Sequence, residues 1–170
     1  MAADPIHPAT GAPFNFAAHL LGRNADRGDK IAYMDDDGTL AYAELDTRIR
    51  RLAAALTGLG IHREERVLLL MHDTPEFVYA FFGAIKIGAV PVPLNTLWKP
   101  ADYDFVVRDA RPSAIVVERG LADRLDARQP VVYVENLLAG GGEELGGLRA
   151  LGFYHRRSAV QASLDVLARL

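Results

Sequence analysis

The stretch from Arg66 to Val92, RVLLLMHDTPEFVYAFFGAIKIGAVPV, is the part of the sequence that decides the fold. Its first apolar run, Val67–Met71, is short and wholly apolar, which suits a strand buried on both faces of a sheet. Pro75 then stands at the first turn of a helix expected over Glu76–Ile87, where the apolar residues recur with helical spacing. A second short apolar run, Ala89–Val92, predicts another strand. A strand, a helix and a second strand in this order predict a parallel pair joined by a right-handed crossover.

Similar elements are predicted on both sides of this unit. The elements expected before it are a helix over Phe14–Leu21, capped by Asn15 and stopped by Gly22, a β-hairpin of Ile31–Met34 and Thr39–Tyr42 around Asp37-Gly38, and a helix over Tyr42–Leu59. Those expected after it are a loop over Asn95–Pro100, a helix from Pro100 or Ala101 to Ala110, a strand over Ser113–Val117, a short helix over Leu121–Ala127 and a strand over Val131–Val134. The predicted fold is therefore α/β, a largely parallel sheet flanked by helices and preceded by a β-hairpin. Pro91 and Pro93 predict that their strand lies at an edge of the sheet or ends early.

The composition divides the chain into four parts. Residues 1–13 are expected to be a flexible lead-in, and residues 14–137 the α/β domain. Residues 138–157 form a predicted glycine-rich linker, and residues 158–170 a terminal helix.

Composition also excludes several classes of function. The 170 residues carry a formal net charge of −3, so binding of nucleic acid through a basic surface is not expected. The absence of cysteine excludes thiol catalysis and cysteine-ligated zinc. The chain has no apolar run long enough to span a membrane and its start does not resemble a secretory signal, so a cytoplasmic protein is expected.

The sequence lacks the common catalytic and phosphate-binding motifs. It contains no G-x-G-x-x-G, no G-x-x-x-x-G-K-[ST] and no G-x-S-x-G, and none of its five histidines stands in an H-E-x-x-H arrangement. Gly140–Gly147 lacks a lysine and a preceding strand, so a linker is the better interpretation than a phosphate cradle. Asp35–Asp37 offers carboxylates to a divalent cation, but a solvated turn is the more ordinary role, and no metal site is predicted.

Two pairs of polar residues follow predicted strands, where α/β sheets bind ligands. His72 is a candidate general base oriented by Asp73, although Asp73 as a helix cap beside a polar neighbour is the favoured interpretation. Trp98 and Lys99 are candidates to meet a nucleotide or acyl group, although packing of the indole onto the core is favoured.

Three stretches resemble the opening motifs of the AMP-forming acyl-CoA synthetases, the adenylate-forming superfamily. They are Thr39–Leu45 (TLAYAEL), Glu65–Met71 (ERVLLLM) and Phe82–Asn95 (FGAIKIGAVPVPLN). Ala41 stands where that family usually has Ser or Thr.

The resemblance covers about residues 14–137 and is greatest to benzoate-CoA and 4-hydroxybenzoate-CoA ligases. The stretches that indicate this subgroup are Phe14–Leu20, Arg63–Met71, and Pro91–Leu97 followed by Asp102-Tyr103.

The resemblance implies an enzyme that joins ATP to an aryl carboxylate, releases pyrophosphate and passes the acyl group from AMP to CoA. ATP, Mg and CoA are thus implied for the full-length family. The family's phosphate loop, its adenine and ribose motifs and its small C-terminal domain match no position in this sequence. We therefore expect this chain to be the N-terminal subdomain of such a ligase. It is expected to bind none of these cofactors, to have no catalytic residue and to be inactive alone. Asn95, Thr96, Trp98 and Lys99 are then expected at the rim of the acyl and CoA channel.

Partners follow from the same resemblance. We expect an apolar face that takes the remainder of the ligase or a second copy of the chain. Two other hypotheses stay open: a stand-alone, non-enzymatic binding or assembly module that reuses the fold, and an unrelated α/β enzyme that uses His72 and Asp73.

Overall fold

A four-stranded parallel sheet forms the centre of the computed structural model, which describes residues 13–36, 38–126 and 131–139. Its strands are β3 (Arg66–Leu70), β4 (Val90–Pro93), β5 (Ala114–Val117) and β6 (Val131–Tyr133), in the spatial order β4-β3-β5-β6. All three strand pairs are parallel. The predicted strands and their alternation with helices are therefore confirmed, and β4, with its two prolines, lies at an edge as expected.

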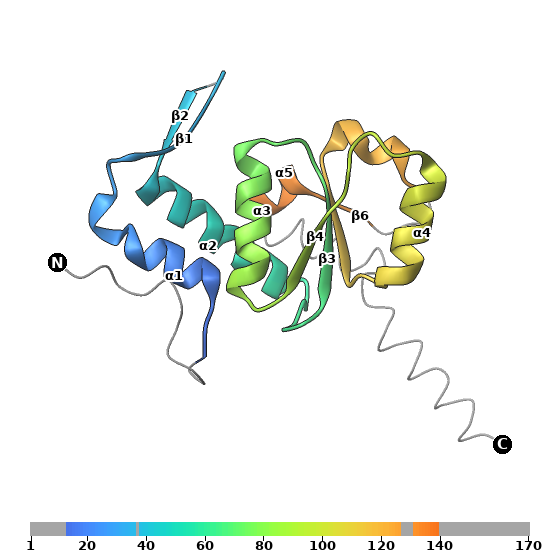
Figure 1. Cartoon of the computed structure of the whole chain (residues 1–170), viewed down its shortest axis with the longest axis horizontal. Helices are drawn as coiled ribbons and strands as arrows, with labels where there is room; N and C mark the ends of the chain where they lie inside the picture. The colour runs from blue at the N-terminus through green and yellow to red at the C-terminus, as the bar shows by residue number, and fades with distance from the viewer. Residues whose placement is uncertain (1–12, 37, 127–130, 140–170) are drawn as a thin grey trace.

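Helices cover both faces of the sheet, which Figure 1 shows edge-on between them. The helices on one side are α1 (Phe16–Arg23), α2 (Tyr42–Gly58), α3 (Pro75–Lys86) and α5 (Val134–Ala139), and those on the other are α4 (Pro100–Ala110) and the 3-10 helix η2 (Arg119–Arg124). Val67 and Leu69 of β3 belong to the core cluster on the α2 and α3 side, whereas Leu68 and Leu70 belong to the cluster under α4. The central strand is thus buried on both faces, as its unbroken apolar run predicted.

The hairpin precedes the sheet and is separate from it. Strands β1 (Ile31–Asp35) and β2 (Gly38–Ala41) pair antiparallel and project from the helical layer in Figure 1, after a short 3-10 helix η1 (Ala25–Arg27). The backbone N–H of Gly38 donates to Oδ1 of Asp35 at 2.9 Å, which closes the turn. This hydrogen bond gives Asp35 a structural role in the hairpin.

A close contact between α2 and α3 sets the position of α3 on the sheet. Gly83 of α3 faces Leu52 of α2, and a Cβ atom at Gly83 would lie 2.8 Å from Leu52 Cδ2 and 3.3 Å from the Ala53 nitrogen. Only glycine allows the two helices to approach this closely.

Several predicted boundaries are corrected by the structure. Asn15 caps α1 as expected, with Oδ1 accepting the N–H of Ala18 at 3.0 Å, but the helix continues through Gly22 and ends at Arg23. The short helix expected over Leu121–Ala127 is instead the 3-10 helix η2, which starts at Arg119. A glycine ends a helix by adopting a positive φ, and Gly22 does not have one, so α1 continues through it.

The end of the described region also differs from the prediction. Val134 begins α5 instead of ending the last strand, and Leu138 and Ala139, expected in the linker, lie in that helix. The predicted lead-in up to residue 12, the linker from residue 140 and the terminal helix over 158–170 lie outside the described residues. Among the described helices, none is both long and apolar enough to cross a bilayer.

Candidate functional site

Polar side chains gather where the parallel strands end at their carboxyl edge. His72 follows β3, the loop from Asn95 to Lys99 follows β4, and Glu118 follows β5. Because β3, β4 and β5 are neighbours and parallel, the topology brings these three segments to one edge of the sheet. This is the edge at which open α/β sheets bind ligands.

Glu118 holds His72 with both of its carboxylate oxygens. The backbone N–H of His72 donates to Oε1 of Glu118 at 2.8 Å, and the ring Nδ1 lies 2.6 Å from Oε2. The His72 side chain is 58% exposed and that of Glu118 is 20% exposed. A carboxylate at Nδ1 orients an imidazole and leaves Nε2 as the second ring nitrogen, which is an arrangement able to hold or move a proton.

The alternative hypothesis that Asp73 orients the His72 ring was therefore wrong, and the favoured role of Asp73 as the helix cap is not observed either, because Thr74 is the N-cap residue of α3. The partner of the ring is Glu118, and the recorded contact of Asp73 is its backbone carbonyl, which accepts the hydroxyl of Tyr33 at 3.1 Å. Glu118 was missed although the signal was present in the sequence, since it directly follows a buried strand just as His72 does.

The predicted rim residues share the loop between β4 and α4. Oδ1 of Asn95 accepts the N–H of Leu97 at 2.8 Å, and the N–H of Lys99 donates to Asp102 at 3.1 Å at the start of α4. The carbonyl of Thr96 accepts a hydrogen bond from the guanidinium of Arg124. The loop is thus fixed at its start, its middle and its end.

Trp98 is partly buried, as is Thr96, whereas Asn95 and Lys99 are exposed. The Trp98 ring centroid lies 6.0 Å from that of Tyr103, a fully buried residue of α4, and the indole packs against the core cluster to which Tyr103 belongs. The hydroxyl of Tyr103 donates to the carbonyl of Asn95 at 2.9 Å. Packing onto the core, the favoured interpretation from the sequence, is what the geometry shows, and a role at a channel rim stays a prediction.

Arg119 joins the last two strands at the same edge and was also missed by sequence reasoning. Its guanidinium carbon lies 4.3 Å from the ring centroid of Tyr133, and its backbone N–H donates to Glu135 at 3.2 Å. A cation over an aromatic ring next to a carboxylate stabilises the end of β6 against η2.

A second cluster of polar side chains, which includes Tyr33 of the hairpin and Tyr79 of α3, lies between the hairpin and α3. Burial raises the pKa of the Tyr79 hydroxyl to about 12, with a further contribution from the charge of Glu76. Desolvation also raises the pKa of Tyr33, followed by the charges of Asp73 and Asp35. Both phenols are held neutral, and the excess of carboxylates here disfavours an anionic ligand.

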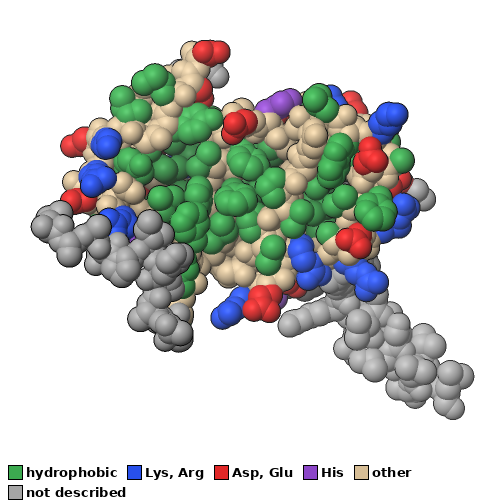
Figure 2. All heavy atoms as spheres, viewed as in Figure 1, with side chains coloured by type: hydrophobic (Ala, Val, Ile, Leu, Met, Phe, Trp, Pro, Cys, Tyr) green, Lys and Arg blue, Asp and Glu red, His purple; other side chains and the backbone are tan. Residues whose placement is uncertain are grey.

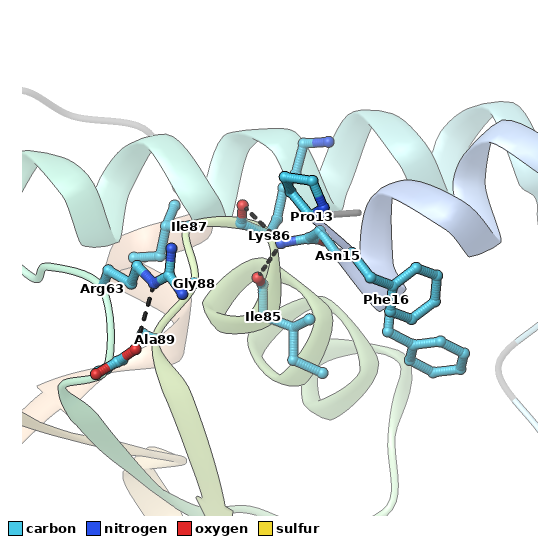
Figure 3. A pocket seen from close by; sticks show the side chains of 11 residues that line it. Pro13, Asn15, Phe16, Arg63, Ile85, Lys86, Ile87, Gly88 and Ala89 are labelled. Carbon is cyan, nitrogen blue, oxygen red and sulfur yellow. Dashed lines mark hydrogen bonds and ion pairs between the residues drawn. The ribbon is translucent and has the colours of Figure 1, made fainter. Parts of the chain in front are cut away.

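A hollow lies at the opposite edge of the sheet from the predicted rim. It has a volume of about 550 Å³ and is lined by residues that precede β3 and β4, together with the start of α1 (Figure 3). The amide of Asn15 crosses it and donates to the carbonyls of Ile85 at 2.7 Å and Lys86 at 3.3 Å. These hydrogen bonds between lining residues join the start of α1 to the end of α3.

The described residues contain no cluster of side chains suited to a metal ion. No group of three or more His, Cys, Asp or Glu side chains in this part of the chain is placed to hold a metal ion. Asp37 of the candidate acidic turn and the glycine run Gly140–Gly147 lie outside the described residues.

Residues 21–148 match the family model described as AMP-binding enzyme. The benzoate–CoA ligase of Thauera aromatica is 38% identical over 150 residues, which are 85% of this chain and 28% of the ligase. The 4-hydroxybenzoate–CoA/benzoate–CoA ligase of Rhodopseudomonas palustris is 34% identical over 156 residues, which are 81% of this chain and 29% of that protein. This chain thus spans less than a third of the length of the curated ligases it matches.

Solved structures agree with these matches. A benzoate CoA ligase from Burkholderia xenovorans LB400 superposes with a TM-score of 0.70 at 39% identity, covering 75% of this chain and 28% of that chain. The N-terminal domain of FACL13 from Mycobacterium tuberculosis superposes with a TM-score of 0.67 at 28% identity, covering 75% of this chain and 36% of that chain. The fold matches the N-terminal part of CoA ligase structures. The chain belongs to the AMP-binding, or adenylate-forming, enzyme family, and within that family it is similar to benzoate–CoA and 4-hydroxybenzoate–CoA ligases.

Proposed function

We propose that this chain is the N-terminal part of an aryl-acid CoA ligase of the benzoate or 4-hydroxybenzoate type. The observation that carries the proposal is the 38% identity to the Thauera aromatica enzyme over 85% of this chain. The reaction proposed for the whole enzyme has two steps. A carboxylate oxygen attacks the α-phosphorus of ATP and displaces pyrophosphate, and the sulfur of CoA then attacks the acyl carbon and displaces AMP.

The part of the ligase beyond this chain supplies ATP and Mg binding in this proposal. The described residues hold no cluster fit for a metal ion, and the sequence has no glycine-rich loop ending in lysine. The chain alone is therefore expected to be inactive, because it cannot hold the triphosphate in line with a carboxylate.

The contribution of this chain is a rigid wall at the carboxyl edge of its sheet. Asn95, Thr96, Trp98 and Lys99 are proposed to form part of the rim of the acyl and CoA channel, with His72 on the same edge. The hydrogen bonds of Asn95, Thr96 and Lys99 support this role, because a fixed loop loses little freedom when a ligand binds.

Reconstitution in two pieces tests the proposal. The 170-residue chain is mixed with the Thauera aromatica benzoate–CoA ligase from which the segment aligned to this chain has been removed, and benzoate-dependent exchange of pyrophosphate into ATP is measured. We expect no exchange above blank from either piece and measurable exchange from the mixture. Exchange by this chain alone would contradict the proposal. So would an inert mixture when the relative's own excised segment restores exchange, and a stand-alone binding module would then be favoured.

A further inference from the structure

Helix α3 is apolar on the side that the described part of the chain leaves partly exposed. Its charged residues are confined to its ends, at Glu76 and Lys86. The side chains that remain partly exposed along it are Phe77, Val78, Phe81, Phe82 and Ile85. A helix that is apolar all round is normally covered on all sides in the working protein.

Aromatic rings continue this surface from α3 onto α1. Ring centroids lie 5.9 Å apart between Phe77 and Phe81, 5.5 Å between Phe81 and Phe82, and 5.8 Å between Phe82 and Phe16. Phe16 is 48% exposed. We call these four side chains the aromatic face. Figure 2 shows apolar side chains gathered over α1, α3 and β4, with charged groups mostly toward the rim, as at a site of protein interaction.

The edge strand beside the aromatic face is closed to strand addition. The N–H groups of Val90 and Leu94 donate toward β3, to the carbonyls of Glu65 at 2.8 Å and Leu69 at 2.9 Å. Backbone groups alternate in direction along a strand, so positions 91 and 93 face away from β3. Both are proline, and the outward edge of β4 therefore has no N–H to donate.

These two features together define how a partner can bind. The chain spans 28% of the Thauera aromatica ligase, so most of such an enzyme lies outside it. We propose that the polypeptide completing the ligase docks on the aromatic face by side-chain packing and does not extend the sheet at β4. This inference rests on the proposed function and adds the contact surface and the mode of contact.

Binding in the two-piece system tests the docking surface separately from catalysis. The dissociation constant between the 170-residue chain and the shortened Thauera aromatica ligase is measured by sedimentation or calorimetry. Phe16→Glu and Phe81→Glu are expected to weaken binding by about tenfold or more, because each places a carboxylate in a desolvated apolar contact. Phe16 occupies the first turn of α1, where an acidic residue is compatible with the helix, so this variant is expected to fold. The matched control is Phe105→Glu, a 64% exposed residue on α4, which is expected to bind as the wild type does.

Pro91→Ala/Pro93→Ala tests the mode of contact. This variant restores two outward N–H groups, and its affinity should equal that of the wild type if the partner packs only on side chains. Tighter binding would show that a strand pairs at β4 and would overturn the proposal.

The remaining outcomes separate the proposals. Wild-type affinity in both glutamate variants overturns the docking surface, as does the absence of a complex when the relative's own segment binds. The 170-residue chain could also form a dimer with itself. If Phe16→Glu dissociates that dimer but leaves the mixed complex intact, the aromatic face binds a second copy, and this result also overturns the proposal. A mixed complex sensitive to Phe16→Glu but unable to exchange pyrophosphate supports the docking surface and contradicts the proposed function.

Discussion

Single side chains tie together the loops at the carboxyl edge of the sheet. Glu118 holds both the backbone and the ring of His72, and Arg124 holds the carbonyl of Thr96. The position of His72 at this edge could be predicted, because a polar residue directly after a buried strand must emerge there. Its partner could not be predicted by adjacency in sequence, since Glu118 lies 46 positions away and is brought close only by the pairing of β3 with β5.

The contact with Glu118 predicts which ring nitrogen of His72 carries the proton in the neutral imidazole. A carboxylate accepts only from N–H, so the proton should reside on Nδ1 and leave Nε2 unprotonated. Long-range ¹⁵N–¹H NMR measures this tautomer once the ¹⁵N chemical shifts show that the ring is neutral. Glu118→Ala should shift the population toward the Nε2-protonated form. An unchanged tautomer ratio in this variant would contradict the contact.

Tyr79 predicts a loss of stability at alkaline pH. Its pKa is raised to about 12 in the folded protein, chiefly by burial, from an ordinary value of 10.0. The neutral phenol is therefore favoured in the folded state, and this stabilisation is present below pH 10 and is lost as the pH rises toward 12. Urea titrations between pH 9 and 12 should show a falling free energy of unfolding. The fall should be smaller in Tyr79→Phe, and an equal fall in both proteins would contradict the assignment.

At the scale of elements, the sequence predicted the bounds of some helices and strands better than those of others. The strand β3 was predicted nearly to the residue from its unbroken apolar run, and the helix α2 from a helical period sustained over 17 residues. The bounds of the short elements η2 and α5 were not predicted. Six residues are too few to show a period, and such short elements depend on packing with their neighbours. The edge position of β4 followed from the chemistry of proline alone.

The contact between α2 and α3 predicts opposite outcomes for two similar substitutions. Gly83→Ala should lower the free energy of unfolding by about 1–3 kcal/mol, because the new Cβ would overlap Leu52 and approach the backbone of Ala53. Gly22→Ala in α1 meets nothing within 4 Å and should raise stability by about 0.5–1 kcal/mol through helix propensity. Both values are obtained from urea unfolding followed by circular dichroism. Equal effects of the two substitutions would contradict the close approach at Gly83.

At the scale of the whole molecule, the described residues form a buried core on each face of the sheet and a partly exposed aromatic face over α1 and α3. The sheet is covered by helices on both faces, yet the described residues leave the aromatic face of α1 and α3 partly exposed, beside an edge strand whose outward side has no N–H to donate. Composition and periodicity could predict the α/β core, because core residues repeat along each element. They could not reveal the open face, since an apolar side chain has the same pattern whether it meets its own chain or another one.

The measurement that tests the central claim most directly is benzoyl-CoA formation by a chimaera. In this protein the 170-residue chain replaces its aligned segment in the Thauera aromatica benzoate–CoA ligase, and the thioester formed from benzoate, ATP and CoA is quantified after folding has been verified by circular dichroism. If the chain is the N-terminal part of an aryl-acid CoA ligase, the chimaera forms benzoyl-CoA and loses this activity when Phe16 is replaced by glutamate but not when Phe105 is. A folded chimaera that forms no benzoyl-CoA, while the parent ligase does under the same conditions, would contradict the account.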